Sequence, residues 1–204
     1  MQITPRDLNN KALHELFMSA FLPRPIAFVS TIGADGVLNA APFSSVAPIG
    51  LKPALVCFNI GRKGNGQKKD TLKNIESCGE FVVNVVDEAL AEQMNQAAAD
   101  YPPEVDEFKE TGLTPVKSLL VKPPMIGDSP VNMECRLKQI LEFGEAATGS
   151  HVIIGEILLV HVREELWTGI DIDVSRLKPI GRLGAQLYCR TTDVFEMKRP
   201  AAKV

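Results

Sequence analysis

The chain has 204 residues, of which 45% are hydrophobic and 23% charged, and these values fit a single globular domain over residues 1–204 with its core at about 24–190. A formal net charge of −3 argues against a nucleic-acid binder, and no apolar run is long enough to cross a membrane. Four scattered cysteines without metal-ligand spacing, and an N-terminus without a signal-peptide pattern, predict a cytoplasmic protein with reduced thiols and no metal site.

Hydrophobic periodicity and turn residues predict more strands than helices. In chain order we expect a helix over 4–20, strands over 26–32, 37–41 and 53–60, a helix over 71–78, a strand over 81–86, a helix over 88–99, and strands over 131–143, 151–162 and 187–197. Thr4 and Pro5 should open the first helix, and Asp70 should cap the second, which ends at Gly79. Because the strands sit in hairpins, an antiparallel barrel with peripheral helices is favoured over a βαβ sheet.

The return strand of the first predicted hairpin is unusual, because residues 39–45 read Asn-Ala-Ala-Pro-Phe-Ser-Ser where a packed strand carries bulky side chains. Small residues at a strand end allow a ligand to approach the backbone closely. Exposed N–H groups beside the hydroxyls of residues 30–31 and 44–45 would attract an anion. A tight barrel corner packed with small residues is the other interpretation, and the pattern by itself leaves both open.

A basic, glycine-rich stretch follows, GRKGNGQKKDTLKNI over residues 61–75. It places Arg62, Lys63, Lys68 and Lys69 around the start of a predicted helix. A helix N-terminus carries partial positive charge and free N–H groups, so together with the lysines and Thr71 it suits a phosphate monoester. The Gly-Lys-Ser/Thr ending of a P-loop is absent. A solvated basic loop is the alternative interpretation.

His151 follows Gly149 and Ser150 and leads into an apolar strand. A partly buried histidine bonded to backbone is the plain interpretation of such a residue. His161 stands ten residues further along the same strand, about 33 Å away at the strand rise, so the two histidines cannot share a metal ion.

Several of these stretches, taken in order, carry a family resemblance. The matching segments are RPIAFVST, DGVLNAAPFS, ALVCFNI, DTLKNI with GEFVVNVV, GSHVIIGEI and, more weakly, LKPIGRLGAQLYCR, which together span most of residues 24–190. In these segments the chain resembles the flavin-reductase-like, FMN-binding split-barrel family. The resemblance implies a mainly β fold, a six-stranded antiparallel Greek-key split barrel, that works as a homodimer with FMN in a groove near the subunit interface.

The resemblance also implies roles for individual residues. The cofactor-binding residues would be Ser30, Thr31, Ala41, Pro42, Phe43, Ser44, Ser45, Phe58, Asn59, Ile60, Lys69, Thr71 and Arg182. Among them, Lys69 and Thr71 would bind the phosphate, and residues 58–60 would flank the ribityl chain. His151 matches a position at the reductase face of the flavin, where it would be the catalytic residue, hydrogen-bonding the nicotinamide amide or supplying a proton.

The activity implied by the resemblance is an NAD(P)H-dependent flavin reductase, in which NADH or NADPH passes hydride to flavin N5 and a monooxygenase or another redox partner receives the electrons. The volume missing from residues 39–45 would then be filled by the cofactor, which carries the chemistry itself. An alternative is a flavoredoxin-like electron-transfer protein with tightly bound FMN and a protein redox partner. A third is a barrel with a degenerate pocket that acts only as an interaction scaffold. The acidic segment around residues 101–108 could cover the pocket or the dimer seam.

Overall fold

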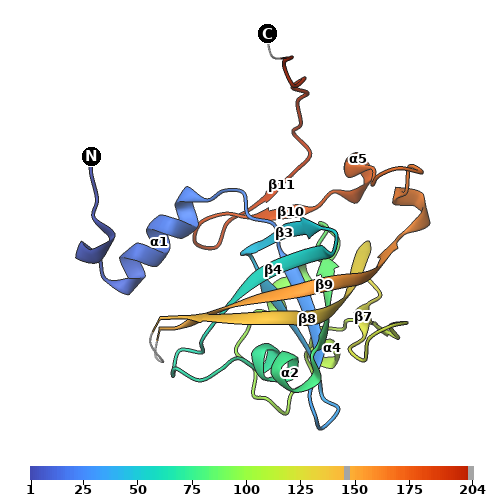
Figure 1. Ribbon diagram of the computed structural model, residues 1–204, viewed down its shortest axis with the longest axis horizontal. Coiled ribbons are helices and arrows are strands. Elements are labelled where there is room, and N and C mark those ends of the chain that lie inside the picture. Colours follow the sequence, from blue (N-terminus) through green and yellow to red (C-terminus); the bar gives the residue numbers. More distant parts are fainter. Residues whose placement is uncertain (145–147, 202–204) are drawn as a thin grey trace.

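The computed structural model describes residues 1–144 and 148–201, and its centre is one curled antiparallel sheet (Figure 1). The sheet has seven strands in the order β2-β1-β5-β8-β9-β4-β3. These strands are β1 (Ala27–Ile32), β2 (Leu38–Phe43), β3 (Val46–Leu51), β4 (Ala54–Gly61), β5 (Glu80–Val85), β8 (Val131–Phe143) and β9 (Ser150–Val162). Its two outer strands, β2 and β3, follow one another across the two-residue connection of Ser44 and Ser45, so this connection joins the two edges of the curled sheet.

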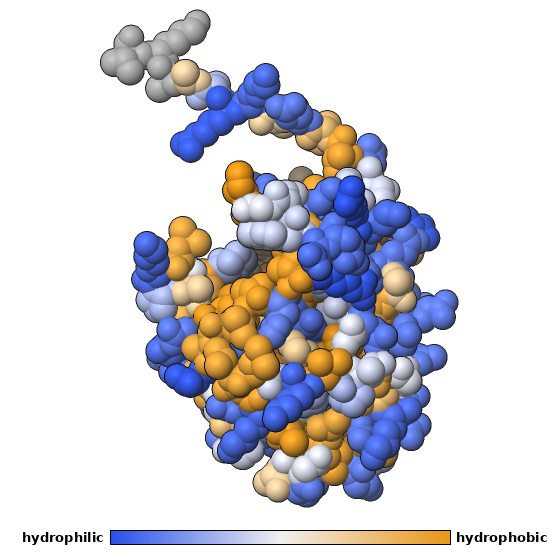
Figure 2. All heavy atoms as spheres, turned by 90° about the vertical axis from the view of Figure 1, so that its right-hand side faces the viewer, coloured by the Kyte–Doolittle hydropathy of each residue, from blue (hydrophilic) through white to orange (hydrophobic). Residues whose placement is uncertain are grey.

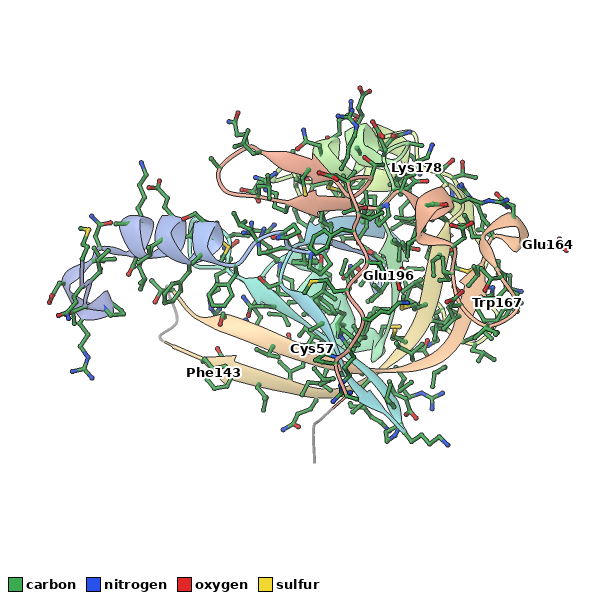
Figure 3. All side chains as sticks on the ribbon, turned by 90° about the horizontal axis from the view of Figure 1, so that it is seen from above. Cys57, Phe143, Glu164, Trp167, Lys178 and Glu196 are labelled. Atoms are coloured by element: carbon green, nitrogen blue, oxygen red, sulfur yellow. The ribbon has the colours of Figure 1, made fainter. Side chains whose placement is uncertain are left out.

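Short helices and hairpins surround the barrel. They are η1 (Pro5–Asp7), α1 (Asn10–Ala20), α2 (Asp70–Cys78), α3 (Ala91–Gln96), α4 (Glu107–Glu110), η2 (Glu164–Leu166), α5 (Val174–Leu177), the hairpin of β6 (Pro115–Val116) and β7 (Met125–Ile126), and the hairpin of β10 (Ile180–Arg182) and β11 (Tyr188–Arg190). Seen from above, α1 projects from one side of the barrel, and Glu164 and Trp167 lie on the opposite side (Figure 3). Helix α1 buries none of its residues.

The barrel interior is packed with aromatic and aliphatic side chains. The rings of Phe43, Phe58 and Phe81 lie in series, with centroids 5.5 and 5.4 Å apart. Gly155 on β9 leaves the space that Phe81 fills, because a Cβ at this glycine would lie 2.4 Å from the Phe81 ring. The glycine is therefore required by packing.

A second apolar cluster covers the outer face of β1. Phe28 is fully buried there against Leu90, Met94 and Phe108, which come from the segment between β5 and β8. Strand β1 is consequently buried on both faces, and its two polar residues, Ser30 and Thr31, are buried with their hydroxyls hydrogen-bonded.

Glu134 on β8 fixes part of that covering segment. Its fully buried carboxylate accepts hydrogen bonds from the backbone amides of residues 119–121 and lies 2.6 Å from Nε2 of His161. Burial acts to raise the pKa of Glu134, but these hydrogen bonds outweigh it and hold the pKa below its ordinary value. One ionised side chain thus anchors three successive amides of a surface loop.

The predicted mainly β, antiparallel barrel is confirmed, with seven strands in the main sheet in place of six. Strand β3 was not predicted, because Pro48 and Gly50 within it disfavour strands. The first helix begins at Asn10, whose preceding residue Asn9 caps it by accepting from the Ala12 amide, and residues 5–7 form only a 3₁₀ turn.

Three other predicted boundaries change. The helix predicted over 88–99 is limited to α3, and the last predicted strand ends at Arg190. Lys69 and not Asp70 is the N-cap of α2, and Gly79 ends this helix in the left-handed conformation, as predicted.

Candidate functional site

A cavity of about 480 Å³ opens where the end of β2 meets the N-terminus of α2. Helix α1, the segment after α3, helix α4 and the β10–β11 hairpin complete its wall. The lining residues include His14, Asn39, Ala41, Pro42, Phe43, Ser44, Lys63, Lys69, Asp70, Thr71, Tyr101, Glu107, Arg182 and Tyr188. Its volume lies within the range of small-molecule binding sites.

The N-terminus of α2 supplies an anion-binding wall. Lys69 is the N-cap residue, and its side chain makes no capping hydrogen bond. The Leu72 amide donates to the Lys69 carbonyl at 3.1 Å, so within the described residues the amides of Asp70 and Thr71 are the ones left for a ligand. Within the residues that the structure describes, the Lys69 ammonium has no carboxylate partner. Thr71, in the first turn, adds a hydroxyl to the same wall.

The other charges beside α2 are already paired. Asp70 lies 2.6 Å from Nζ of Lys63 and 2.9 Å from Nζ of Lys73. Burial acts to raise the pKa of Asp70, but the two lysines outweigh burial and hold that pKa below its ordinary value. Lys69 is therefore the lysine of this wall that is free to meet an anion.

Asn39 connects the walls of the cavity through a network of side chains. Its Oδ1 accepts hydrogen bonds from Thr31 Oγ1 at 3.0 Å and Thr71 Oγ1 at 2.8 Å, and its Nδ2 donates to Oε1 of Glu107 at 2.8 Å. Asn74 in turn donates to Thr31 at 3.1 Å. Burial raises the pKa of Glu107 above its ordinary value. The network fixes α2 and α4 against β1 and β2.

The C-terminal hairpin forms the wall facing residues 41–44. Arg182 places its guanidinium 4.4 Å from the centre of the Tyr188 ring, in cation–π contact. The backbone of Arg182 pairs with that of Arg24, and the Arg24 side chain donates to Ser44 Oγ at 3.3 Å and to the Leu183 carbonyl at 3.0 Å. Arg24 thereby ties the hairpin to the end of β2.

About half of the predicted cofactor-binding residues meet at this cavity. They are Ala41, Pro42, Phe43, Ser44, Lys69, Thr71 and Arg182. Thr31 reaches it only through Asn39. For Ser45, the structure shows only that its carbonyl accepts from the Asn59 amide at 3.1 Å.

The other predicted residues do not line this cavity, and their cofactor-binding role stays a prediction. Ser30 is fully buried in a separate polar cluster, where it donates to the Pro124 carbonyl at 2.6 Å and accepts from Asn84 at 3.1 Å. Phe58 and Ile60 point into the barrel core, and Asn59 between them does not line the cavity either. Residues 58–60 therefore do not flank a ligand in this cavity.

His151 also lies away from the cavity, at the start of β9 and 1% exposed. Its Nε2 is 3.4 Å from Oε1 of Glu142, and neither ring nitrogen has a hydrogen-bond partner among the described residues. The predicted catalytic role of His151 thus gains no support from its position and stays a prediction.

Several lining residues were not assigned to the cofactor site from the sequence. They are His14, Asn39, Lys63, Asp70, Tyr101, Glu107 and Tyr188. Asn39 stands in the predicted small-residue segment, Lys63 in the predicted basic stretch, and Glu107 in the segment that was expected to cover the pocket. The sequence did not mark Glu107 itself, because only the fold brings α4 against β2.

Two kinds of feature are absent from the part of the chain that the structure describes. No group of three histidine, cysteine or acidic side chains is placed to hold a metal ion among residues 1–144 and 148–201. Over the same residues, no helix is both long enough and apolar enough to span a membrane.

The cavity thus joins a helix N-terminus without a side-chain cap to a strand end with small residues, inside an antiparallel barrel. The chain belongs to the flavin reductase like domain family, whose pattern matches residues 18–171.

Known proteins agree with this assignment over nearly the whole chain. The structure of nitrilotriacetate monooxygenase component B from Bacillus cereus is 33% identical, with a TM-score of 0.93 and 97% and 98% of the two chains covered. That of 2-nitrobenzoate 2-nitroreductase NbaA from Pseudomonas fluorescens is 34% identical, with a TM-score of 0.89 and 98% and 96% covered. The uncharacterised protein BH2278 of Halalkalibacterium halodurans is 36% identical over 202 residues, 98% of this chain and 97% of that protein.

Proposed function

We propose that this protein is an NAD(P)H-dependent flavin oxidoreductase that binds FMN in the 480 Å³ cavity. The observation that carries the proposal is the uncapped N-terminus of α2, with the unpaired ammonium of Lys69, set beside the small residues 41–44. The first feature suits a terminal phosphate, and the second leaves room for a flat ring system.

The residues present fit this cofactor. Lys69, Thr71 and the first-turn amides of α2 would hold the phosphate, while residues 41–44 and Arg182 would border the ring. When bound, the flavin supplies the electron-transfer chemistry. The chain supplies binding and orientation, because Asn39 holds Thr71 in place and Arg24 holds the β10–β11 hairpin against Ser44.

The similar proteins support two destinations for the electrons. A protein 33% identical to this chain is described as component B of a monooxygenase, which favours release of reduced flavin to a monooxygenase partner. The other, 34% identical, is described as a 2-nitrobenzoate nitroreductase, which favours direct reduction of a nitroaromatic acid as a second candidate. A flavoredoxin-like carrier with tightly held FMN is the third candidate, for which Lys69 and the N-terminus of α2 would have to supply the tight phosphate binding.

We also propose that the protein is a homodimer. In support, α1 buries no residue, and its Phe17 and Phe21 are 43% and 67% exposed. Apolar side chains gather on one face of the body (Figure 2), and an apolar groove of about 300 Å³ includes Val46, Val83 and Ile157 in its lining. Exposed apolar area of this kind is typical of association surfaces.

The absorption spectrum of the purified protein, taken before and after desalting, tests the proposal. We expect an FMN spectrum that is bleached anaerobically by NADH or NADPH, and nicotinamide oxidation when free FMN is supplied. Flavin retained on desalting with no turnover favours the electron carrier, and turnover that rises with 2-nitrobenzoate favours the nitroreductase. Protein that takes up neither FMN nor FAD contradicts all three candidates and leaves the scaffold interpretation.

A further inference from the structure

Glu107, the first residue of α4, carries a buried carboxylate oxygen that accepts no hydrogen bond from the described residues. The residue is 8% exposed, lines the cavity and accepts a hydrogen bond at Oε1 from Asn39, 2.8 Å away. Its other oxygen, Oε2, is buried and has no hydrogen-bond partner in the described part of the chain. Buried polar atoms are nearly always paired, so an unpaired one on a cavity wall points to a ligand.

The position of Glu107 limits what that ligand group can be. Asn39, which holds Glu107, also accepts from Thr71 at the anion-binding wall, so one side chain separates Glu107 from that wall. A second anionic group would be repelled by the carboxylate, whereas a hydroxyl can donate to it. In FMN, the chain segment attached to the phosphate is a polyol.

We propose that Oε2 of Glu107 binds a hydroxyl of the polyol chain of the flavin, which makes Glu107 a specificity residue for flavins that carry that chain. This inference rests on the proposed function. Glu107 would distinguish flavins with the polyol chain from flavins without it. The phosphate site cannot make this distinction, because it contacts only the phosphate at the end of the ligand.

Three flavins separate the parts of the site: FMN, riboflavin without the phosphate, and lumiflavin without the polyol chain. For Glu107→Leu we expect FMN and riboflavin to bind at least tenfold more weakly, by equal factors, with lumiflavin within twofold of wild type. Glu107→Gln, which keeps groups able to form hydrogen bonds, should stay within threefold for all three. Glu110→Gln, an exposed neighbour on the same helix, is the matched control.

The same measurements detect a purely structural role. If Glu107 only positions Asn39 and Thr71, Glu107→Leu weakens FMN and leaves riboflavin unchanged, and the inference is wrong. Equal losses for lumiflavin, or no loss at all, also overturn it.

A second measurement uses wild-type protein alone, so its outcome does not depend on whether the Glu107→Leu variant folds. Wild-type protein is titrated with the 2′-, 3′- and 4′-deoxy analogues of riboflavin, and we expect at least one to bind about tenfold more weakly than riboflavin. Three analogues within twofold of riboflavin overturn the inference while the proposed function stands. Wild-type protein that binds none of these flavins overturns both.

Discussion

Replacing Lys69 by alanine tests the anion site at its central residue. The Lys69 ammonium is partly buried at the N-cap of α2 and lacks an ion-pair partner among the described residues, so its removal breaks no internal pair. A phosphate about 4 Å from this ammonium would gain roughly 4 kcal/mol at an effective dielectric constant near 20. In the unliganded protein, water solvates the ammonium and offsets part of this gain. The net contribution of Lys69 to phosphate binding is then about 2 kcal/mol, the value of a charged hydrogen bond.

We therefore expect Lys69→Ala to weaken FMN binding roughly 30-fold. Riboflavin, which lacks the phosphate, should bind as it does to wild type, and turnover at saturating flavin should change little, because a phosphate contact does not alter during electron transfer. Flavin fluorescence titrations at two ionic strengths measure these affinities, and the FMN difference should shrink at high salt.

Lys68→Ala is the matched control, since Lys68 is the neighbouring residue but pairs with Glu76 at 2.6 Å, outside the cavity. It should leave FMN affinity within about twofold of wild type, because an exposed ion pair contributes little. The reasoning is refuted if Lys69→Ala weakens riboflavin as much as FMN, or if both lysine variants behave alike.

Three further changes test the fold and the remaining catalytic candidate. Glu134→Gln should lower the free energy of unfolding by about 2 kcal/mol at pH 7. Because the folded pKa of Glu134 is depressed, this difference should shrink in urea titrations as pH falls below about 4.5 through the folded pKa, and a pH-independent difference would contradict the assignment. Gly155→Ala should lower stability by about 1–3 kcal/mol in thermal melts through its clash with Phe81, whereas Gly61→Ala, which meets no atom within 4 Å, should not; equal melting temperatures would count against the clash. His151→Ala should lower turnover while flavin affinity is retained, as the predicted catalytic role requires, and unchanged kinetics would remove His151 from the mechanism.

The positions of most strands followed from local hydrophobic patterns, whereas their pairing across the sheet did not. Strand β8 has the predicted bounds 131–143, but its ladder with β9 shifts register twice, between Glu134 and Cys135 and between Leu137 and Gln139, and no sequence pattern marked these shifts. Strand β3 escaped prediction because its ladder with β4 tolerates Pro48 and Gly50 at a sheet edge, with a register shift between them.

The candidate site was predictable where chemistry is concentrated in one segment. Lys69 and Thr71 stand together at a helix start, and residues 41–44 stand out by their small size, so both signals could be read from the sequence. Glu107 and Tyr188 reach the cavity only after the chain has folded, and no local pattern marks them. Ser30 and Phe58 lie outside the cavity lining, and the sequence could not show this, because strand position alone does not say on which side of the barrel a side chain points.

The backbone β-bridge between Arg24 and Arg182 has a consequence for where the domain can be truncated. The family pattern ends at residue 171, yet Arg182 and Tyr188 complete the wall of the cavity beyond that boundary. A fragment trimmed to 18–171 would keep the barrel strands and lose one side of the pocket. Arg24 would then be left with only part of its hydrogen-bonding shell, so the functional unit of this chain extends at least to β11.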